Sequence, residues 1–152
     1  MLKAGDKAPD FELTTGDGDN VHLGDLKGKP VVLYFYPRDD TPGCTVEACS
    51  FRDLSPQFDK RGVIVYGVST DSAKSHTKFT QKYGLNFPLL SDPDHTVTEA
   101  YDSWGPKKFM GREYLGVKRN TFLIGKDGKI ARVWEGVKPA GHAEEVLQAL
   151  DA

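Results

Sequence analysis

The feature that most constrains the fold is a pair of uninterrupted apolar runs, each followed by a helical pattern. The runs are VVLYFY at 31–36 and VIVYGVS at 63–69. Strands buried on both faces of a parallel sheet read as continuous apolar runs, whereas half-exposed strands alternate. Helical patterns follow at about 45–60 and from 70 or 71 to 83. Strands that alternate with helices predict a central sheet covered by helices on both faces.

Shorter elements complete the predicted order. Thr70 or Asp71 is expected to cap the second helix, and Gly84 to end it. We expect an N-terminal hairpin at 11–14 and 20–23, a strand at 87–90, a helix at 94–101, an irregular segment at 103–118, a hairpin at 120–124 and 129–134, and a closing helix at 141–150. This order matches an α/β, thioredoxin-like fold whose central mixed sheet carries an extra N-terminal β-hairpin. A chain of 152 residues with 38% hydrophobic content predicts one domain, 1–152.

Both cysteines lie in the segment 37–49, which directly follows the first predicted strand. Pro42 and Gly43 interrupt the strand, so Cys44 is expected at a strand-to-helix turn. The free N–H groups and the dipole of a helix N-terminus stabilise an anion, which makes this a favourable place for a thiolate. Lowering a thiol pKa from about 8.5 to about 6 increases the thiolate at pH 7 only about thirtyfold. A fast thiol enzyme therefore also needs groups aimed at its substrate.

Two side chains are candidates for that task. Thr41 offers a hydroxyl three residues before Cys44. Arg119 directly precedes the apolar strand at 120–124, which the predicted fold brings near the first strand–helix junction. Its guanidinium is permanently charged, favours a thiolate and binds oxygen atoms.

These residues carry a resemblance to a known family. Pro37, Thr41 and Cys44 match the Pro-x-x-x-Thr-x-x-Cys signature of the peroxiredoxins, and Arg119 matches the active-site arginine of that family. The longer string at 36–49 resembles the bacterioferritin comigratory protein, or peroxiredoxin Q, subfamily. The resemblance implies a thiol peroxidase that reduces hydrogen peroxide and organic hydroperoxides without a metal or organic cofactor.

The resemblance also implies a catalytic cycle. A sulfenic acid on Cys44 condenses with Cys49, and thioredoxin or a similar dithiol reduces the disulfide. By matched position, the roles are peroxidatic for Cys44, resolving for Cys49, peroxide-binding for Thr41 and Arg119, shielding from water for Pro37, and orienting an arginine for Glu47.

The spacing of the two cysteines adds a geometric condition. On an intact helix, residues five apart have Cα atoms roughly 8.5 Å apart, with diverging side chains. A disulfide needs Cα atoms within about 7 Å. If Cys44 and Cys49 share a helix, its first turns must unwind before the disulfide can form.

Two other functions remain open from the residues. A general disulfide oxidoreductase on the same fold is disfavoured because Cys-x-x-Cys is absent, and because Asn120 stands where thioredoxins have a proline. A copper chaperone that uses Cys44, Cys49 and His142 is disfavoured by the cysteine spacing. The four histidines show no metal-binding pattern, which argues against a zinc site.

Composition sets expectations for partners and location. With a net charge of −2 and no nucleic-acid motif, nucleic-acid binding is not expected. The locally basic segment 107–119 is interpreted as a solvated loop, and a surface that attracts peroxide or docks a reductase is the alternative. No signal peptide and no membrane-spanning run are visible. Two cysteines favour a reducing compartment, so we expect a cytoplasmic protein. The subfamily resemblance favours a monomer.

Overall fold

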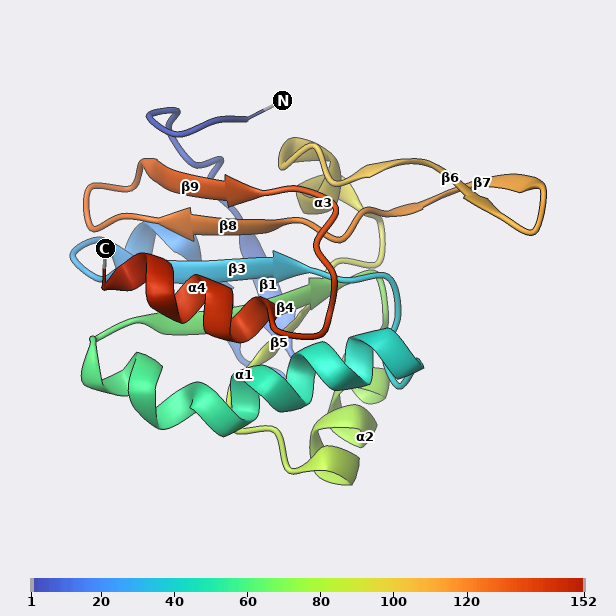
Figure 1. Ribbon diagram of the computed structural model, residues 1–152, viewed down its shortest axis with the longest axis horizontal. Helices are drawn as coiled ribbons and strands as arrows, with labels where there is room; N and C mark the ends of the chain where they lie inside the picture. Colours follow the sequence, from blue (N-terminus) through green and yellow to red (C-terminus); the bar gives the residue numbers. More distant parts are fainter. Residues whose placement is uncertain (1, 152) are drawn as a thin grey trace.

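The computed structural model describes residues 2–151, in which a seven-stranded mixed sheet is accompanied by a two-stranded hairpin (Figure 1). The strands of the sheet are β1 (Glu12–Thr15), β2 (Asn20–His22), β3 (Val31–Phe35), β4 (Ile64–Ser69), β5 (Leu89–Ser91), β8 (Thr121–Ile124) and β9 (Ile130–Trp134). The hairpin is β6 (Trp104–Phe109) and β7 (Arg112–Val117). The helices are α1 (Pro42–Lys60), α2 (Ala73–Tyr83), α3 (Thr96–Ala100) and α4 (His142–Leu150), with a 3-10 turn η1 (Leu23–Leu26).

The strand order across the sheet is β2-β1-β5-β4-β3-β8-β9. Strands β3, β4 and β5 are parallel, while β1 and β8 pair with them in the antiparallel direction. The predicted N-terminal hairpin is present and extends the central sheet through β1. The predicted mixed, thioredoxin-like sheet is thus confirmed.

The continuous apolar sequence of β3 follows from its burial, since the strand is covered on both faces. Val32 and Tyr34 belong to one core cluster, whereas Val31, Leu33 and Phe35 belong to the other. Helices α1, α2 and α4 supply the apolar side chains of the first cluster, and α1 and α4 lie side by side across that face of the sheet (Figure 1). A site at the N-terminus of α1 therefore lies on this face of the sheet.

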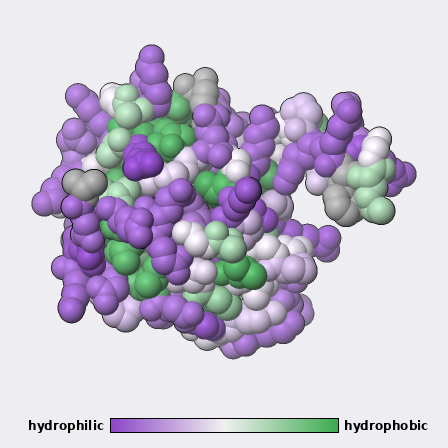
Figure 2. Space-filling view, in the orientation of Figure 1, coloured by the Kyte–Doolittle hydropathy of each residue, from purple (hydrophilic) through white to green (hydrophobic). Residues whose placement is uncertain are grey.

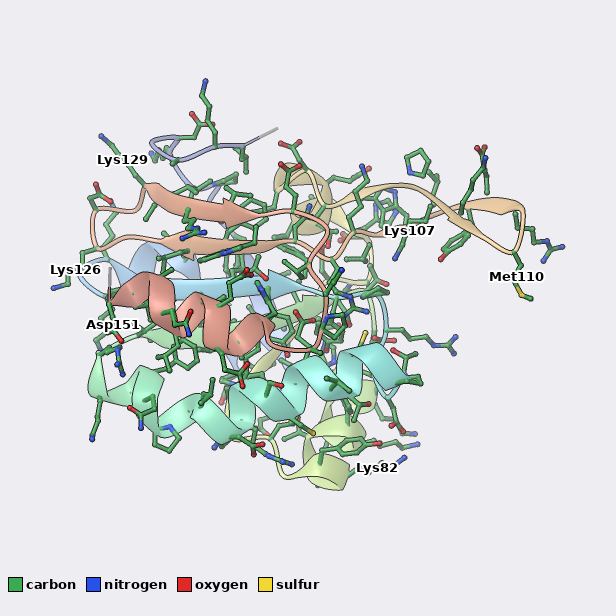
Figure 3. The ribbon with its side chains drawn as sticks, in the orientation of Figure 1. Lys82, Lys107, Met110, Lys126, Lys129 and Asp151 are labelled. Carbon is green, nitrogen blue, oxygen red and sulfur yellow. The ribbon has the colours of Figure 1, made fainter. Side chains whose placement is uncertain are left out.

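The segment expected to be irregular is instead the β6–β7 hairpin, so that prediction was wrong. Its turn uses positive φ at Met110 (52°) and Gly111 (79°), which suits a two-residue hairpin turn. Residues 112–115 are all exposed, so the hairpin lacks the alternation that marks a half-buried strand. The arm stands away from the body, with Lys107 near its base and Met110 at its tip (Figures 2 and 3).

Helix α2 begins slightly later than expected. Its N-cap is Ser72, whose Oγ accepts a hydrogen bond from the Ser75 N–H at 3.1 Å, rather than Thr70 or Asp71. The carboxylate of Asp71 is engaged elsewhere, since it accepts from Ser69 Oγ at 2.7 Å. Gly84 is the C-cap and ends the helix as predicted, with a left-handed φ of 61°.

Strand β5 is shifted relative to the expected 87–90. It begins at Leu89, after Pro88, which has no N–H to donate to a ladder. Within residues 2–151, no helix combines the length and the apolar character that crossing a bilayer requires.

Candidate active site

Cys44 lies in the first turn of α1, as the strand-to-helix interpretation predicts. The helix begins at Pro42, preceded by Thr41 in an extended N-cap conformation (φ −97°, ψ 156°). Proline suits the first turn, where its missing N–H has no intrahelical partner to lose. Cys44 is 1% exposed and belongs to the core cluster beneath α1. Its thiol is thus held at the positive end of a long helix, largely shielded from water.

Arg119 reaches this thiol from the segment that connects β7 to β8. Its Nη2 donates to Cys44 Sγ at 3.4 Å, and its Nη1 donates to Glu47 Oε1 at 3.0 Å. One guanidinium therefore bridges the cysteine and a carboxylate one helical turn further along α1. The expected proximity of Arg119 to Cys44, and the expected pairing of Glu47 with an arginine, are both present in this geometry.

The carboxylate of Glu47 is unusual because its side chain is completely buried. Burial raises its pKa from 4.5 to about 7, although the charge and hydrogen bond of Arg119 oppose the rise. Its second oxygen, Oε2, is buried without a hydrogen-bond partner among the described residues. Burial disfavours the charge of Arg119, but Cys44 and Glu47 outweigh it, and the pKa of Arg119 is raised. The guanidinium is therefore charged at every relevant pH.

Gly43 is a further component of the site, which the sequence analysis interpreted only as a strand breaker. A Cβ at this position would lie 3.3 Å from Arg119 Nη2 and 3.2 Å from Pro139 Cγ. Both distances are tighter than most real Cβ contacts, so a side chain here would push against the arginine. The missing side chain allows Arg119 to approach the turn that carries Cys44.

The other predicted residues lie around this core at different places. Thr41 precedes α1, and its hydroxyl donates to the Arg38 carbonyl at 3.0 Å and accepts no capping hydrogen bond from the helix. Pro37 is half-buried just beyond β3. Cys49 is half-buried on the same unbroken helix as Cys44, and both thiols are free. The geometric condition for unwinding is therefore met.

An open cleft of about 670 Å³ lies beside Arg119, at the base of the β6–β7 hairpin. Lys107 extends into this region, where its Nζ donates to the Val117 carbonyl at 2.9 Å. Burial and the charge of Arg119 lower the pKa of Lys107. Asn120, which also lines the cleft, is buried and links Ser103 Oγ to the Gly136 N–H. The lining of the cleft combines cationic side chains with acidic and apolar ones, among them Glu135 and Trp104.

His142 does not offer a free metal ligand. Its Nε2 lies 2.8 Å from Thr121 Oγ1, and its Nδ1 lies 3.0 Å from Glu145 Oε1. Across residues 2–151, no cluster of three or more histidine, cysteine or carboxylate side chains is arranged to hold a metal ion. His142, the third ligand of the copper-chaperone alternative, is therefore already engaged through both of its ring nitrogens.

Comparisons with known proteins find similar sequences over nearly the whole chain. Residues 4–133 match the model of the AhpC/TSA family. The putative peroxiredoxin bcp of Coxiella burnetii is 53% identical over 149 residues, which cover 98% of this chain and 99% of the relative. Peroxiredoxin Bcp of Bacillus subtilis is 49% identical, with coverage of 98% and 95%.

Solved structures are also similar to this chain over nearly its whole length. A Xanthomonas campestris bacterioferritin comigratory protein, studied for alkyl peroxide reduction, superposes with a TM-score of 0.91 at 42% identity and 97% coverage of each chain. A cysteine-to-serine mutant of Xylella fastidiosa PrxQ has a TM-score of 0.94 at 39% identity, covering 99% of this chain and 96% of its own.

Proposed function

The chain belongs to the AhpC/TSA family of peroxiredoxins and is a thiol peroxidase; from this premise we propose that Cys44 is its peroxidatic cysteine and Cys49 its resolving cysteine. The observation that carries the proposal is the bridge from Arg119 to both Cys44 Sγ (3.4 Å) and Glu47 Oε1 (3.0 Å). The fixed positive charge of Arg119, together with the N-terminus of α1, favours the thiolate of Cys44 over the thiol.

In the first step, the Cys44 thiolate attacks one oxygen of a hydroperoxide. An S–O bond forms as the O–O bond breaks, and the departing oxygen takes up a proton and leaves as an alcohol or, from hydrogen peroxide, as water. Sulfur is oxidised by two electrons to the sulfenic acid, and the peroxide is reduced. Arg119 donates to the peroxide oxygens as negative charge develops on the departing one, and the Thr41 hydroxyl, whose hydrogen goes to the Arg38 carbonyl, accepts from the peroxide O–H.

Glu47 acts through Arg119 and is a positioning residue. By engaging Nη1, it holds the plane of the guanidinium so that Nη2 faces the sulfur. Pro37, at the end of β3, shields the thiol from water by its place beside the turn. These roles describe a site made from one chain, without a cofactor.

In the second step, the Cys49 thiolate attacks the sulfenic sulfur of Cys44. The S–S bond forms, the S–O bond breaks, and the released hydroxide takes up a proton to become water. Because both cysteines lie on α1, the first turns of the helix unwind to bring them together. A dithiol of the thioredoxin type then reduces the disulfide and is itself oxidised.

The test is a single turnover with one equivalent of hydrogen peroxide, read by thiol counting and intact mass. The wild type is expected to lose two thiols and gain no oxygen. Cys49→Ser is expected to react with peroxide at a similar rate, to retain one oxygen atom on Cys44, and to stall with a thioredoxin-type reductant. Sustained turnover of Cys49→Ser at the wild-type rate with that reductant would exclude Cys49 as the resolving cysteine.

We further infer that the chain works as a monomer in the cytoplasm and folds as one domain, 1–152. Cys44, Glu47 and Arg119 contact one another within a single chain. The need for a dithiol reductant suits a reducing compartment, and both core clusters share one sheet. Light scattering of the reduced protein tests whether it is a monomer, and cell fractionation tests its location. Coincident urea transitions by fluorescence and circular dichroism test whether it folds as one domain.

A further inference from the structure

The loop that joins β3 to α1 is attached to α2 by two neighbouring aspartates. Asp39 and Asp40 occupy the middle of this loop, five and four residues before Cys44. The loop leads directly into the first turn of α1, which begins at Pro42 with Thr41 as its N-cap. The strength of its attachment is therefore relevant to the step that brings Cys44 to Cys49.

Asp39 is the buried attachment, with a side chain only 5% exposed. One carboxylate oxygen accepts from Tyr36 Oη at 2.5 Å. The other accepts from Ser75 Oγ at 2.7 Å and lies 2.7 Å from His76 Nδ1. Burial and the nearby Asp39 carboxylate raise the pKa of Tyr36 well above its usual value, so the phenol stays neutral and remains a donor. The carboxylate is thus fully engaged.

His76 extends this attachment to the central sheet. It is completely buried on α2, and its Nε2 lies 2.9 Å from the Leu90 carbonyl of β5. Because a carbonyl only accepts, Nε2 carries a hydrogen toward Leu90, while Nδ1 faces the Asp39 carboxylate at 2.7 Å. The imidazole therefore joins the loop, α2 and β5 through both of its nitrogens.

The backbone of Asp39 is tied as well. Its N–H donates to Asp71 Oδ2 at 2.8 Å, and the same oxygen accepts from Ser69 Oγ at the end of β4. Buried polar groups that are fully paired rigidify their surroundings, and breaking one partner leaves the others unpaired in a dry environment. Release of Asp39 from this network is consequently costly.

Asp40 is the exposed attachment and provides a natural contrast. Its carboxylate accepts from Lys82 Nζ at 2.8 Å and from Tyr83 Oη at 2.7 Å. The side chains of Asp40 and Lys82 are 42% and 59% exposed, and Lys82 lies on the outside of the molecule (Figure 3). Exposed ion pairs contribute little to stability because water and salt compete with them.

We propose that the buried Asp39–His76 pair is a latch that delays the unwinding of the first turn of α1, and so sets how the Cys44 sulfenic acid is divided between two fates. This inference rests on the proposed roles of Cys44 and Cys49. Both latch residues are positioning residues, since they act through the loop and not on the peroxide. A tighter latch lengthens the life of the sulfenic acid in the folded site.

The two fates compete for the same sulfur. Attack by Cys49 forms the disulfide and releases water. Attack on a second hydroperoxide breaks another O–O bond, transfers one oxygen to sulfur and releases an alcohol or water, which leaves Cys44 as a sulfinic acid. Unwinding is needed only for the first fate, so loosening the latch favours the disulfide.

The test compares His76→Gln with the wild type, since the glutamine amide cannot reproduce both contacts of the imidazole. The main readout is the fraction of Cys44 converted to sulfinic acid per turnover at a fixed excess of peroxide, measured by mass spectrometry with a thioredoxin-type reductant present. We expect this fraction to fall about threefold or more. Hydrogen exchange of residues 37–45 in the reduced protein is expected to accelerate, while β3 and β4 remain protected.

Lys82→Ala is the matched control because it removes the exposed ion pair between the same loop and the same helix, and leaves only the Tyr83 hydrogen bond to Asp40. Its sulfinic fraction is expected to stay within 1.5-fold of the wild type, consistent with the small value of exposed ion pairs. If His76→Gln does not fold, Ser75→Ala, which removes a single hydrogen bond to Asp39, is measured under the same criteria. A smaller decrease in the same direction is then expected.

An unchanged or increased sulfinic fraction in the folded latch variant would overturn the proposal, even if that variant were less stable. Equal decreases in His76→Gln and Lys82→Ala would also overturn it, because the effect would not then depend on the buried pair. Failure of the proposed function itself gives a different result: Cys49→Ser would then form no more sulfinic acid than the wild type.

Discussion

The two halves of α1 are held to the protein by different kinds of contact. The second half is anchored by large aromatic side chains: Phe51 and Phe58 are 0% and 1% exposed, and Phe51 stacks on Tyr34 with ring centroids 4.7 Å apart. The first half buries only small apolar groups, such as Ala48, together with the polar site. Truncating a buried phenylalanine to alanine costs about 3–5 kcal/mol, far more than the small side chains of the first half can contribute.

The difference indicates how one helix serves two steps. The first half depends on directional polar contacts to Arg119, which organise the thiol for attack but are lost together once the turn opens. The second half keeps its aromatic packing whether or not the first turns are helical. We therefore expect opening to stop near Phe51, so that the protein remains folded while the disulfide forms.

The largest effect is expected from Cys44→Ser, which leaves both halves of the helix intact and removes only the nucleophile. A serine hydroxyl is not ionised near pH 7 and attacks peroxide poorly, so activity should be abolished. The measurement is the peroxidase rate with a thioredoxin-type reductant. Residual turnover above a few per cent of the wild type would place the nucleophile elsewhere.

Arg119→Lys is expected to reduce kcat/KM for peroxide about a hundredfold or more, although the charge is kept. A planar fork that contacts Cys44 Sγ and Glu47 Oε1 together is replaced by a single ammonium. Loss of one donor aimed at the transition state costs about 3 kcal/mol. A variant within threefold of the wild type would remove Arg119 from the site, and the matched control is Arg132→Lys on β9.

Oxidation itself tests the boundary between the two halves. In the disulfide form, hydrogen exchange at residues 42–49 is expected to accelerate about tenfold or more, and protection at residues 54–60 should stay close to that of the reduced protein. Mass spectrometry of the same samples confirms the disulfide. Equal protection of both halves in both redox states would contradict unwinding.

The last prediction concerns how burial of Glu47 makes the free energy of unfolding depend on pH. Its pKa rises from 4.5 to about 7 on folding, so between these values the folded state binds the proton and the unfolded state does not. The free energy of unfolding therefore falls as pH rises through this window, by up to about 3 kcal/mol for this group. Glu47→Gln should remove that fall.

Urea denaturation at pH 5 and pH 8 measures this effect. The glutamine variant is expected to gain stability relative to the wild type at pH 8 and little at pH 5. Its peroxidase rate should drop about tenfold, because Arg119 exchanges an anionic acceptor for a neutral amide oxygen. A wild-type advantage in stability that grows with pH would contradict the assignment. Glu144→Gln on α4, whose side chain is exposed, is the control.

Much of the fold could be predicted because its signals are local. Continuous apolar runs identified β3 and β4, and Gly84 marked the end of α2. The β6–β7 hairpin was missed because residues 112–115 all face solvent, so their sequence does not alternate between apolar and polar residues as in a half-buried strand. Ser72 was missed as a cap because several adjacent residues share the chemistry of capping.

The candidate site divides in the same way. Neighbouring residues and helix geometry were enough to place Cys44 at a helix N-terminus and Cys49 too far along that helix for a disulfide. The tertiary structure was needed to show that Glu47 is buried and that Gly43 makes room for Arg119. It alone also brought His76 to Asp39, because these contacts join residues distant in the chain and depend on how the sheet packs against its helices.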